Sequence, residues 1–164
     1  MILAFGMALG LASATPQAAM GAHAACPMAE HRRAVDQRHQ DATGVAGGAS
    51  EHHFRLTPDG GSILLEAADA HDDATRDAAR AHLQHIARAF AAGDFSLPYR
   101  IHDRVPPGVP ELKRLRAGIR YGYEDTERGG RVTLTTSDPE ALRAVHEFLR
   151  FQIRDHATGD PESE

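Results

Sequence analysis

The feature that most constrains the fold of this chain is an internal repeat. Two stretches of sequence carry the same pattern of apolar residues, glycines and aspartates at a constant offset of 69 residues. The matched pairs are Gly60 with Gly129, Ile63 with Val132, Leu65 with Leu134 and Asp69 with Asp138. Because a repeat corresponds to one supersecondary unit, the chain is expected to contain two copies of one motif.

Each copy begins with a pattern typical of a β-hairpin. Apolar and polar residues alternate from His52 to Ala67, with a turn at Asp59-Gly60-Gly61. The same alternation runs from Ile119 to Leu134, with a turn at Arg128-Gly129-Gly130. Since successive side chains of a strand point to opposite faces, each predicted hairpin has one apolar face.

Each predicted hairpin leads into a predicted amphipathic helix. The first covers about 73–91 and has an apolar stripe at helical spacing. The second begins at Pro139 behind the capping residue Asp138 and continues through Ile153. The proline-rich connector over 93–118 is expected to hold one short helix at about 111–116.

Two ββα units bury both apolar faces by forming one sheet covered by two helices. The predicted fold class is therefore α+β: a four-stranded antiparallel sheet with two helices on one face. The other face of the sheet is expected to be polar and exposed, and to carry His53, Arg55, Leu64, Glu66, Arg120, Glu124, Thr133 and Thr135.

The amino terminus is typical of an exported protein. Residues 1–24 combine a short apolar run with small residues and cleavage sites of the A-x-A type, so they are predicted to be a signal peptide. The run is too short for a membrane span, so no span is expected after cleavage, and the protein is expected to be periplasmic or secreted. Residues 25–50 are expected to be a flexible arm and linker, 51–157 the folded domain and 158–164 a disordered tail.

Composition excludes some partners and draws attention to histidine. The chain has 18 Lys and Arg against 23 Asp and Glu, and its aromatic content is 5%, which argues against nucleic acid. It also has 11 histidines and a single cysteine. Any chemistry is therefore expected to be imidazole chemistry.

The arm contains donors of the kind that copper prefers. Cys26, Met28, His31 and His39 combine soft sulfur with borderline imidazole nitrogen. They are candidate metal ligands, although such residues are often simply exposed.

The first predicted helix contains a second candidate metal pair. His82 and His85 are three residues apart and therefore lie on one side of the helix. His52 and His146 fall at or beside the apolar faces of the first hairpin and the second helix. If the first hairpin packs under the helices, both are expected to converge with His82 on a copper or zinc ion. The alternatives are two surface histidines at 82 and 85 and hydrogen-bonded core histidines elsewhere. His71 and His102 are expected at the surface, and His156 is expected to interact with a helix dipole.

Known catalytic motifs do not match the chain. Arg150 occupies the position at which a zinc-protease motif starting at His146 needs its second histidine. The sequence has neither the glycine-flanked serine of hydrolases nor a phosphate-binding loop. Catalysis is therefore the less favoured interpretation, and no catalytic residue is identified.

Three segments resemble a known family. HHFRLTPDGGSILLEA, RAHLQHIARAFAAGDFSLPYRIH and AVHEFLRFQIRDHATGD are similar to segments of small secreted bacterial proteins with histidine-containing helices. Some members are labelled aspartate carbamoyltransferase, a label that does not suit a chain too short for the two domains of that enzyme. The resemblance covers about 52–160 and implies a shared fold and export.

These observations support two functional hypotheses. The first is an exported metal-binding protein, using histidines to sequester or pass on copper or zinc. The second is a non-catalytic interaction domain that forms homodimers through the open face of the sheet, or through an exposed Phe151, with its histidines incidental.

Overall fold

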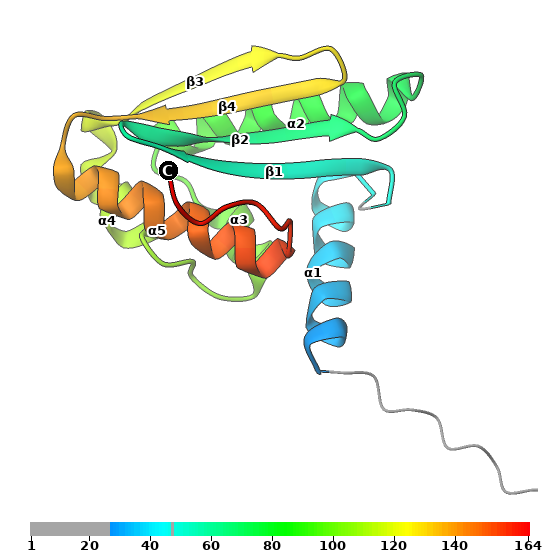
Figure 1. Ribbon diagram of the computed structural model, residues 1–164, viewed down its shortest axis with the longest axis horizontal. Coiled ribbons are helices and arrows are strands. Elements are labelled where there is room, and N and C mark those ends of the chain that lie inside the picture. Colours follow the sequence, from blue (N-terminus) through cyan, green and yellow to red (C-terminus); the bar gives the residue numbers. More distant parts are fainter. Residues whose placement is uncertain (1–26, 47) are drawn as a thin grey trace, which may run out of the picture.

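Two hairpins form the sheet, as the alternation predicts. The computed structural model describes residues 27–46 and 48–164. The first hairpin consists of β1 (Ser50–Thr57) and β2 (Gly60–Ala67), and the second of β3 (Arg120–Asp125) and β4 (Gly129–Thr135). The four strands are antiparallel and lie in the order β1-β2-β4-β3 (Figure 1). The predicted α+β fold class is confirmed.

The central pairing of the sheet follows the symmetry of the repeat. Strands β2 and β4 pair so that Ile63 lies opposite Val132, its equivalent in the second copy. Gly60 pairs with Thr135, and Glu66 pairs with Gly129. These two pairs correspond to each other, because Gly129 is the equivalent of Gly60 and Thr135 is the equivalent of Glu66. The two hairpins are therefore related by an approximate two-fold axis that passes between β2 and β4.

Glycine is required where each hairpin approaches the other copy. A Cβ built on Gly60 would lie 1.8 Å from the carbonyl oxygen of Leu134, and one built on Gly129 would lie 2.0 Å from that of Leu65. Both distances are far below van der Waals contact. The repeated glycines therefore permit the strand pairing that joins the two copies.

Two helices cover the apolar face of the sheet. Helix α2 (Asp73–Ala91) packs on β2, β3 and β4, and α5 (Pro139–His156) packs on β1 and β2 (Figure 1). Each helix thus covers mainly the hairpin of the other copy. Between the layers lies one core of large, fully buried side chains: Leu65, Leu83, Phe90, Phe95, Leu134, Phe148 and Leu149.

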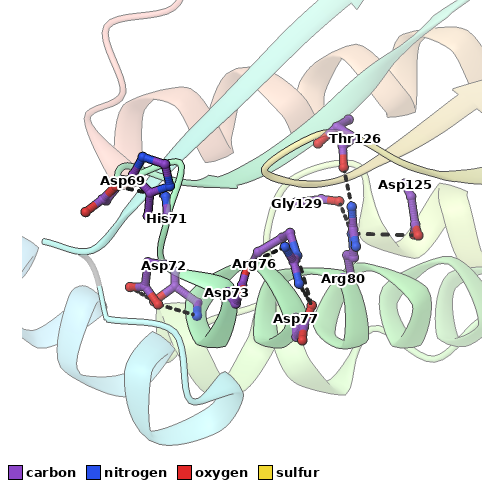
Figure 2. Close-up of polar contacts among 11 residues, drawn as sticks. Asp69, His71, Asp72, Asp73, Arg76, Asp77, Arg80, Asp125, Thr126 and Gly129 are labelled. Atoms are coloured by element: carbon purple, nitrogen blue, oxygen red, sulfur yellow. Dashed lines mark hydrogen bonds and ion pairs between the residues drawn. The ribbon is translucent and has the colours of Figure 1, made fainter.

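Polar contacts fix the position of α2. Its N-cap residue Asp72 accepts a hydrogen bond from the backbone N–H of Thr75. About two turns further on, Arg80 donates to the carbonyl oxygens of Thr126 and Gly129 in the turn of the second hairpin (Figure 2). Helix α2 is therefore held against the second hairpin by a charged hydrogen-bond donor as well as by apolar packing.

The connector folds into short helices. Helix α3 (Ser96–His102) precedes α4 (Val109–Leu115) and a 3-10 turn, η1 (Arg116–Gly118). The short helix expected at 111–116 corresponds to α4. Helix α3 was not expected because it contains Pro98, but this proline lies in the first turn, where a missing N–H costs little.

Two terminal segments differ from expectation. Residues 25–50 were expected to be a flexible arm, yet Pro27–Thr43 form helix α1, which packs against α3, α5 and α2 (Figure 1). Residues 158–164 were expected to be disordered, but Asp160 accepts a hydrogen bond from the backbone N–H of Phe54 in the edge strand β1. Arg150 donates to the carbonyl oxygen of Glu162. The tail therefore runs along β1 and satisfies part of its free edge.

Two further expectations concern exposure. Phe151 was expected to be exposed, but it is 6% exposed and packs against the ring of His102. Its apolar ring is thus part of the interior and not a contact surface. Among the described residues, no helix is both long and apolar enough to cross a membrane.

Candidate functional site

Five histidines from five different elements gather at one end of the core. They are His39 of α1, His52 of β1, His82 of α2, His102 of α3 and His156 of α5, and we call them the imidazole cluster. His52 lies on the strand face that carries Phe54 and Leu56. His82 and His156 lie at the edges of the apolar stripes of their helices. The cluster therefore forms where α1 closes the space between the sheet and the helices.

Three members of the cluster form a triangle. The ring centroids of His39 and His52 are 5.6 Å apart, those of His39 and His156 5.9 Å, and those of His52 and His156 5.0 Å. His82 lies 5.5 Å from His39 on one side of the triangle. His102 lies 4.9 Å from His156 on the other side. Each ring therefore has at least one imidazole neighbour within contact distance.

The triangle contains ring nitrogens that the protein does not satisfy. The Nε2 atoms of His39 and His52 are buried, and neither has a hydrogen-bond partner within the described residues. The cluster borders a small cavity of about 30 Å³, which is also lined by Phe54, Leu83, Phe90, Ile101 and Phe148. Buried polar atoms without partners are uncommon in proteins and call for an explanation.

Burial keeps these imidazoles neutral. Desolvation lowers the pKa of His82 and of His156 to about 3, and nearby histidines add to the effect. The pKa of His52 lies well below its usual value for the same reasons, and desolvation also lowers that of His39. A neutral imidazole has one nitrogen with a free lone pair, which is the form that binds a metal ion.

Asp155 lies beside the cluster and holds His102 in place. Its Oδ2 is 2.6 Å from Nδ1 of His102, and its Oδ1 is 2.9 Å from Nε2 of His31. Arg104 also donates to this carboxylate. Although burial by itself raises the pKa of Asp155, the hydrogen bonds from His31 and His102 hold it below its usual value. Asp155 is therefore a buried carboxylate whose charge is already balanced.

The structure brings together two of the histidines expected to share a metal ion. His52 and His82 both belong to the imidazole cluster, on either side of His39. His85 is exposed, one helical turn from His82. His146 lies at the turn of the first hairpin, where its Nε2 is 3.0 Å from the carbonyl oxygen of Thr57 and 2.9 Å from that of Gly60. His146 therefore holds the turn and does not face the cluster.

Of the candidate ligands in the arm, too, only some lie at the cluster. His39 enters the cluster, whereas His31 contacts Asp155 at its edge. Met28 is 64% exposed at the start of α1. Cys26 lies outside the described residues. The arm therefore contributes its histidines to this region by forming a helix.

Sequence reasoning did not assign His102 or His156 to the site. His102 was expected at the surface but is 2% exposed, and His156 was expected to act as a cation at a helix end. His156 continues the apolar stripe of α5, since it lies three residues after Ile153 and seven after Leu149. That spacing is a signal that could have identified it, whereas His102 is the last residue of the short helix α3, which has no comparable pattern.

The arrangement is one of neighbouring rings and not of a formed metal centre. In the part of the chain that the structure describes, no three His, Cys, Asp or Glu side chains are already arranged to hold a metal ion. Three imidazoles bound to one ion at about 2 Å place their ring centroids about 5–5.5 Å apart, which is close to the spacing in the triangle. To bind one ion, the three rings would only have to rotate about their side-chain torsions.

A second, larger hollow lies on the open face of the sheet. It has a volume of about 870 Å³ and is lined by Arg55, Ser62, Arg131, Thr133 and residues of the C-terminal tail. His53 lies at its edge and contacts Asp160. Its floor consists of the polar sheet face that the alternation predicts.

Comparisons with known proteins find no matching family, no similar curated protein and no similar solved structure.

Proposed function

We propose that this protein binds one transition-metal ion, copper or zinc, at the imidazole cluster, with His39, His52 and His156 as ligands. The observation that carries the proposal is the pair of buried Nε2 atoms, on His39 and His52, that lack hydrogen-bond partners among the described residues. Each unsatisfied buried polar group costs about 1–3 kcal/mol. A bound ion removes this cost by using the same lone pairs.

The alternative explanation is a set of core histidines with a purely structural role. His146 illustrates that role, because its ring nitrogen contacts two carbonyl oxygens and holds a turn. His39 and His52 make no comparable contact through Nε2 within residues 27–46 and 48–164. A metal-binding role accounts for this difference.

The cavity favours storage or transfer of an ion over catalysis. Its volume of about 30 Å³ is that of roughly one water molecule. A catalytic metal keeps an open position for water or substrate, and an organic substrate needs a site of several hundred Å³. We therefore propose sequestration or handling of the ion. The predicted signal peptide, which lies outside the described residues, supports the same role outside the cytoplasm.

Single substitutions combined with metal titration test the proposal. The variants His39→Ala, His52→Ala and His156→Ala are each expected to weaken binding more than about 100-fold, since even the residues that orient metal ligands contribute about 10–100-fold. His71→Ala and His85→Ala remove exposed imidazoles and are expected to leave the affinity unchanged. Circular dichroism of each variant checks that the fold is retained.

The same titration can contradict the proposal. If His85→Ala abolishes binding while His39→Ala does not, the ion is bound at the surface of α2, as a simple His-x-x-His site. If neither the wild-type protein nor any variant binds copper or zinc, the metal-binding proposal fails. The interaction-domain hypothesis, with the open sheet face as contact surface, then becomes the leading one.

A further inference from the structure

The charges around the imidazole cluster bear on which ion it accepts. This argument rests on the metal-binding function proposed above. Among the described residues, no carboxylate forms an ion pair or a hydrogen bond with His39, His52, His82 or His156. The ion pairs of histidine involve His31, His53, His102 and His146 instead. Asp36 and Asp155 act on His39 and His156 only at longer range. The three proposed ligands are therefore neutral donors that no carboxylate contacts directly.

The nearest buried carboxylate does not change this balance. Asp155 directly precedes His156 in the chain, but its oxygens already pair with His31, His102 and Arg104. It orients His102 through a short hydrogen bond. The negative charge of Asp155 is thus balanced by the groups that it contacts.

The surroundings of the triangle are apolar. The ring of Phe54 lies 4.5 Å from that of His52 and 5.7 Å from that of His156. Leu83, Ile86, Phe90 and Phe148 line much of the rest of the cavity, beside the uncharged side chains of His82, His102 and Gln152. The cavity itself, at about 30 Å³, has room for about one water molecule.

An ion in such a site keeps its full charge in a medium of low polarity. The cost of moving an ion from water into an apolar medium rises with the square of its charge, so a divalent ion pays about four times as much as a monovalent one of equal size. Three neutral imidazoles bring no negative charge to offset the larger cost of the divalent ion. The site therefore discriminates by charge, because its donor atoms are of the same borderline type that copper and zinc both accept.

We infer that the imidazole cluster selects monovalent copper, Cu(I), over the divalent ions Cu(II) and Zn(II). The triangle of His39, His52 and His156 provides the three-coordinate nitrogen environment, and the apolar walls with no carboxylate in contact with the ligands provide the selectivity. This order differs from that of an ordinary imidazole site, in which Cu(II) binds more tightly than other divalent ions of the first row.

Competition titrations with the untagged protein test the inference. Cu(I) is titrated anaerobically against a chromophoric Cu(I) chelator, and Zn(II) and Cu(II) are titrated against chelators of known affinity. The expected result is that Cu(I) binds at least about 100-fold more tightly than Zn(II), a difference of about 2.7 kcal/mol. Cu(II) is expected to bind more weakly than Cu(I) as well.

A variant that restores a negative charge gives a second readout. Gln152 is buried, lines the cavity and contacts His102. Gln152→Glu keeps the shape of the side chain and adds a carboxylate, so it is expected to shift the preference at least about tenfold toward Zn(II). The control Glu147→Gln changes the charge of an exposed residue on the same helix and is expected to leave the preference unchanged.

The outcomes separate the two proposals. Tighter binding of Zn(II) or Cu(II) than of Cu(I), with the same dependence on His39 and His52, overturns the inference and leaves the metal-binding function intact. An unchanged preference in Gln152→Glu also overturns the charge argument. Failure of all three ions to bind overturns the proposed function and the inference together.

Discussion

A buried imidazole stabilises a protein only when its ring nitrogens have partners. His146 meets this condition through the carbonyl oxygens of Thr57 and Gly60, whereas His39 and His52 leave Nε2 without a partner in the described chain. His52 and His146 were not distinguishable in the sequence, because both lie at or beside the apolar face of their element. The contacts that separate them join residues far apart in the chain.

This difference predicts opposite effects of the same substitution. In metal-free protein, His52→Phe is expected to raise the free energy of unfolding by about 1 kcal/mol, because it replaces an unsatisfied polar ring beside Phe54 with an apolar one. His146→Phe is expected to lower it by about 1–3 kcal/mol, since two turn carbonyls lose a donor. Urea unfolding measures both. A His52→Phe variant that is destabilised as strongly as His146→Phe would mean that His52 is structural.

Burial of neutral histidines also predicts how stability depends on pH. His82 and His156 have a pKa of about 3 in the folded protein against 6.5 when unfolded, so between these values the unfolded chain binds more protons. The free energy of unfolding of metal-free protein is therefore expected to rise with pH from about 3 to 6.5 and to level off above it. Each such histidine contributes a slope of about 1.4 kcal/mol per pH unit.

Urea unfolding between pH 4.5 and 8 checks this slope. His82→Leu is expected to reduce it below pH 6.5, whereas His71→Ala, which removes an exposed histidine, is expected to leave it unchanged. A stability that is independent of pH over this range would contradict the neutral state of the cluster.

At the scale of elements, the sequence predicted the structures whose pattern is periodic. Both hairpins, α2 and α5 have alternating or helical apolar spacing, and all four are present. Helix α1 was not predicted because its buried side consists mainly of Val35 and His39. A polar helix of this kind depends on tertiary contacts, here His31 with Asp155 and Arg38 with the carbonyl oxygen of Ile101.

Since α1 supplies one proposed ligand and little apolar surface, metal binding is expected to hold it in place. Amide hydrogen exchange within Pro27–Thr43 should slow at least about tenfold when the metal is added, because the ion links His39 to β1 and α5. The His39→Ala variant should show no such slowing. Equal protection of α1 with and without metal in the wild-type protein would argue against His39 as a ligand.

At the scale of the whole molecule, the repeat explains both the fold and the place of the site. The offset of 69 residues predicted two matching hairpins, and in the structure β2 and β4 pair symmetrically about the equivalent residues Ile63 and Val132. The cluster could not be predicted in the same way, because it draws on α1 and α3, which lie outside the repeat, as well as on β1, α2 and α5. His52 and His82 were identified as candidates, but their neighbours depend on how α1 docks.

The symmetry predicts similar costs for equivalent glycines. Gly60→Ala and Gly129→Ala are each expected to lower the free energy of unfolding by about 2–4 kcal/mol, because a Cβ at either position overlaps a backbone carbonyl of the other copy. Gly118→Ala has open space around its Cβ and serves as the control. Thermal unfolding measures all three. If only one of the two glycines is sensitive, the close approach between the copies is not equivalent.

The central claim is that the buried imidazole cluster, and not the exposed histidines, binds a metal ion. The most direct measurement is the metal content per chain, by elemental analysis, of untagged protein from copper- and zinc-supplemented cultures. It compares the wild type with two triple variants. The cluster variant combines His39→Ala, His52→Ala and His156→Ala. The control variant combines His53→Ala, His71→Ala and His85→Ala. We expect about one ion per chain in the wild type and the control and almost none in the cluster variant. Equal metal content in the two triple variants would contradict the claim.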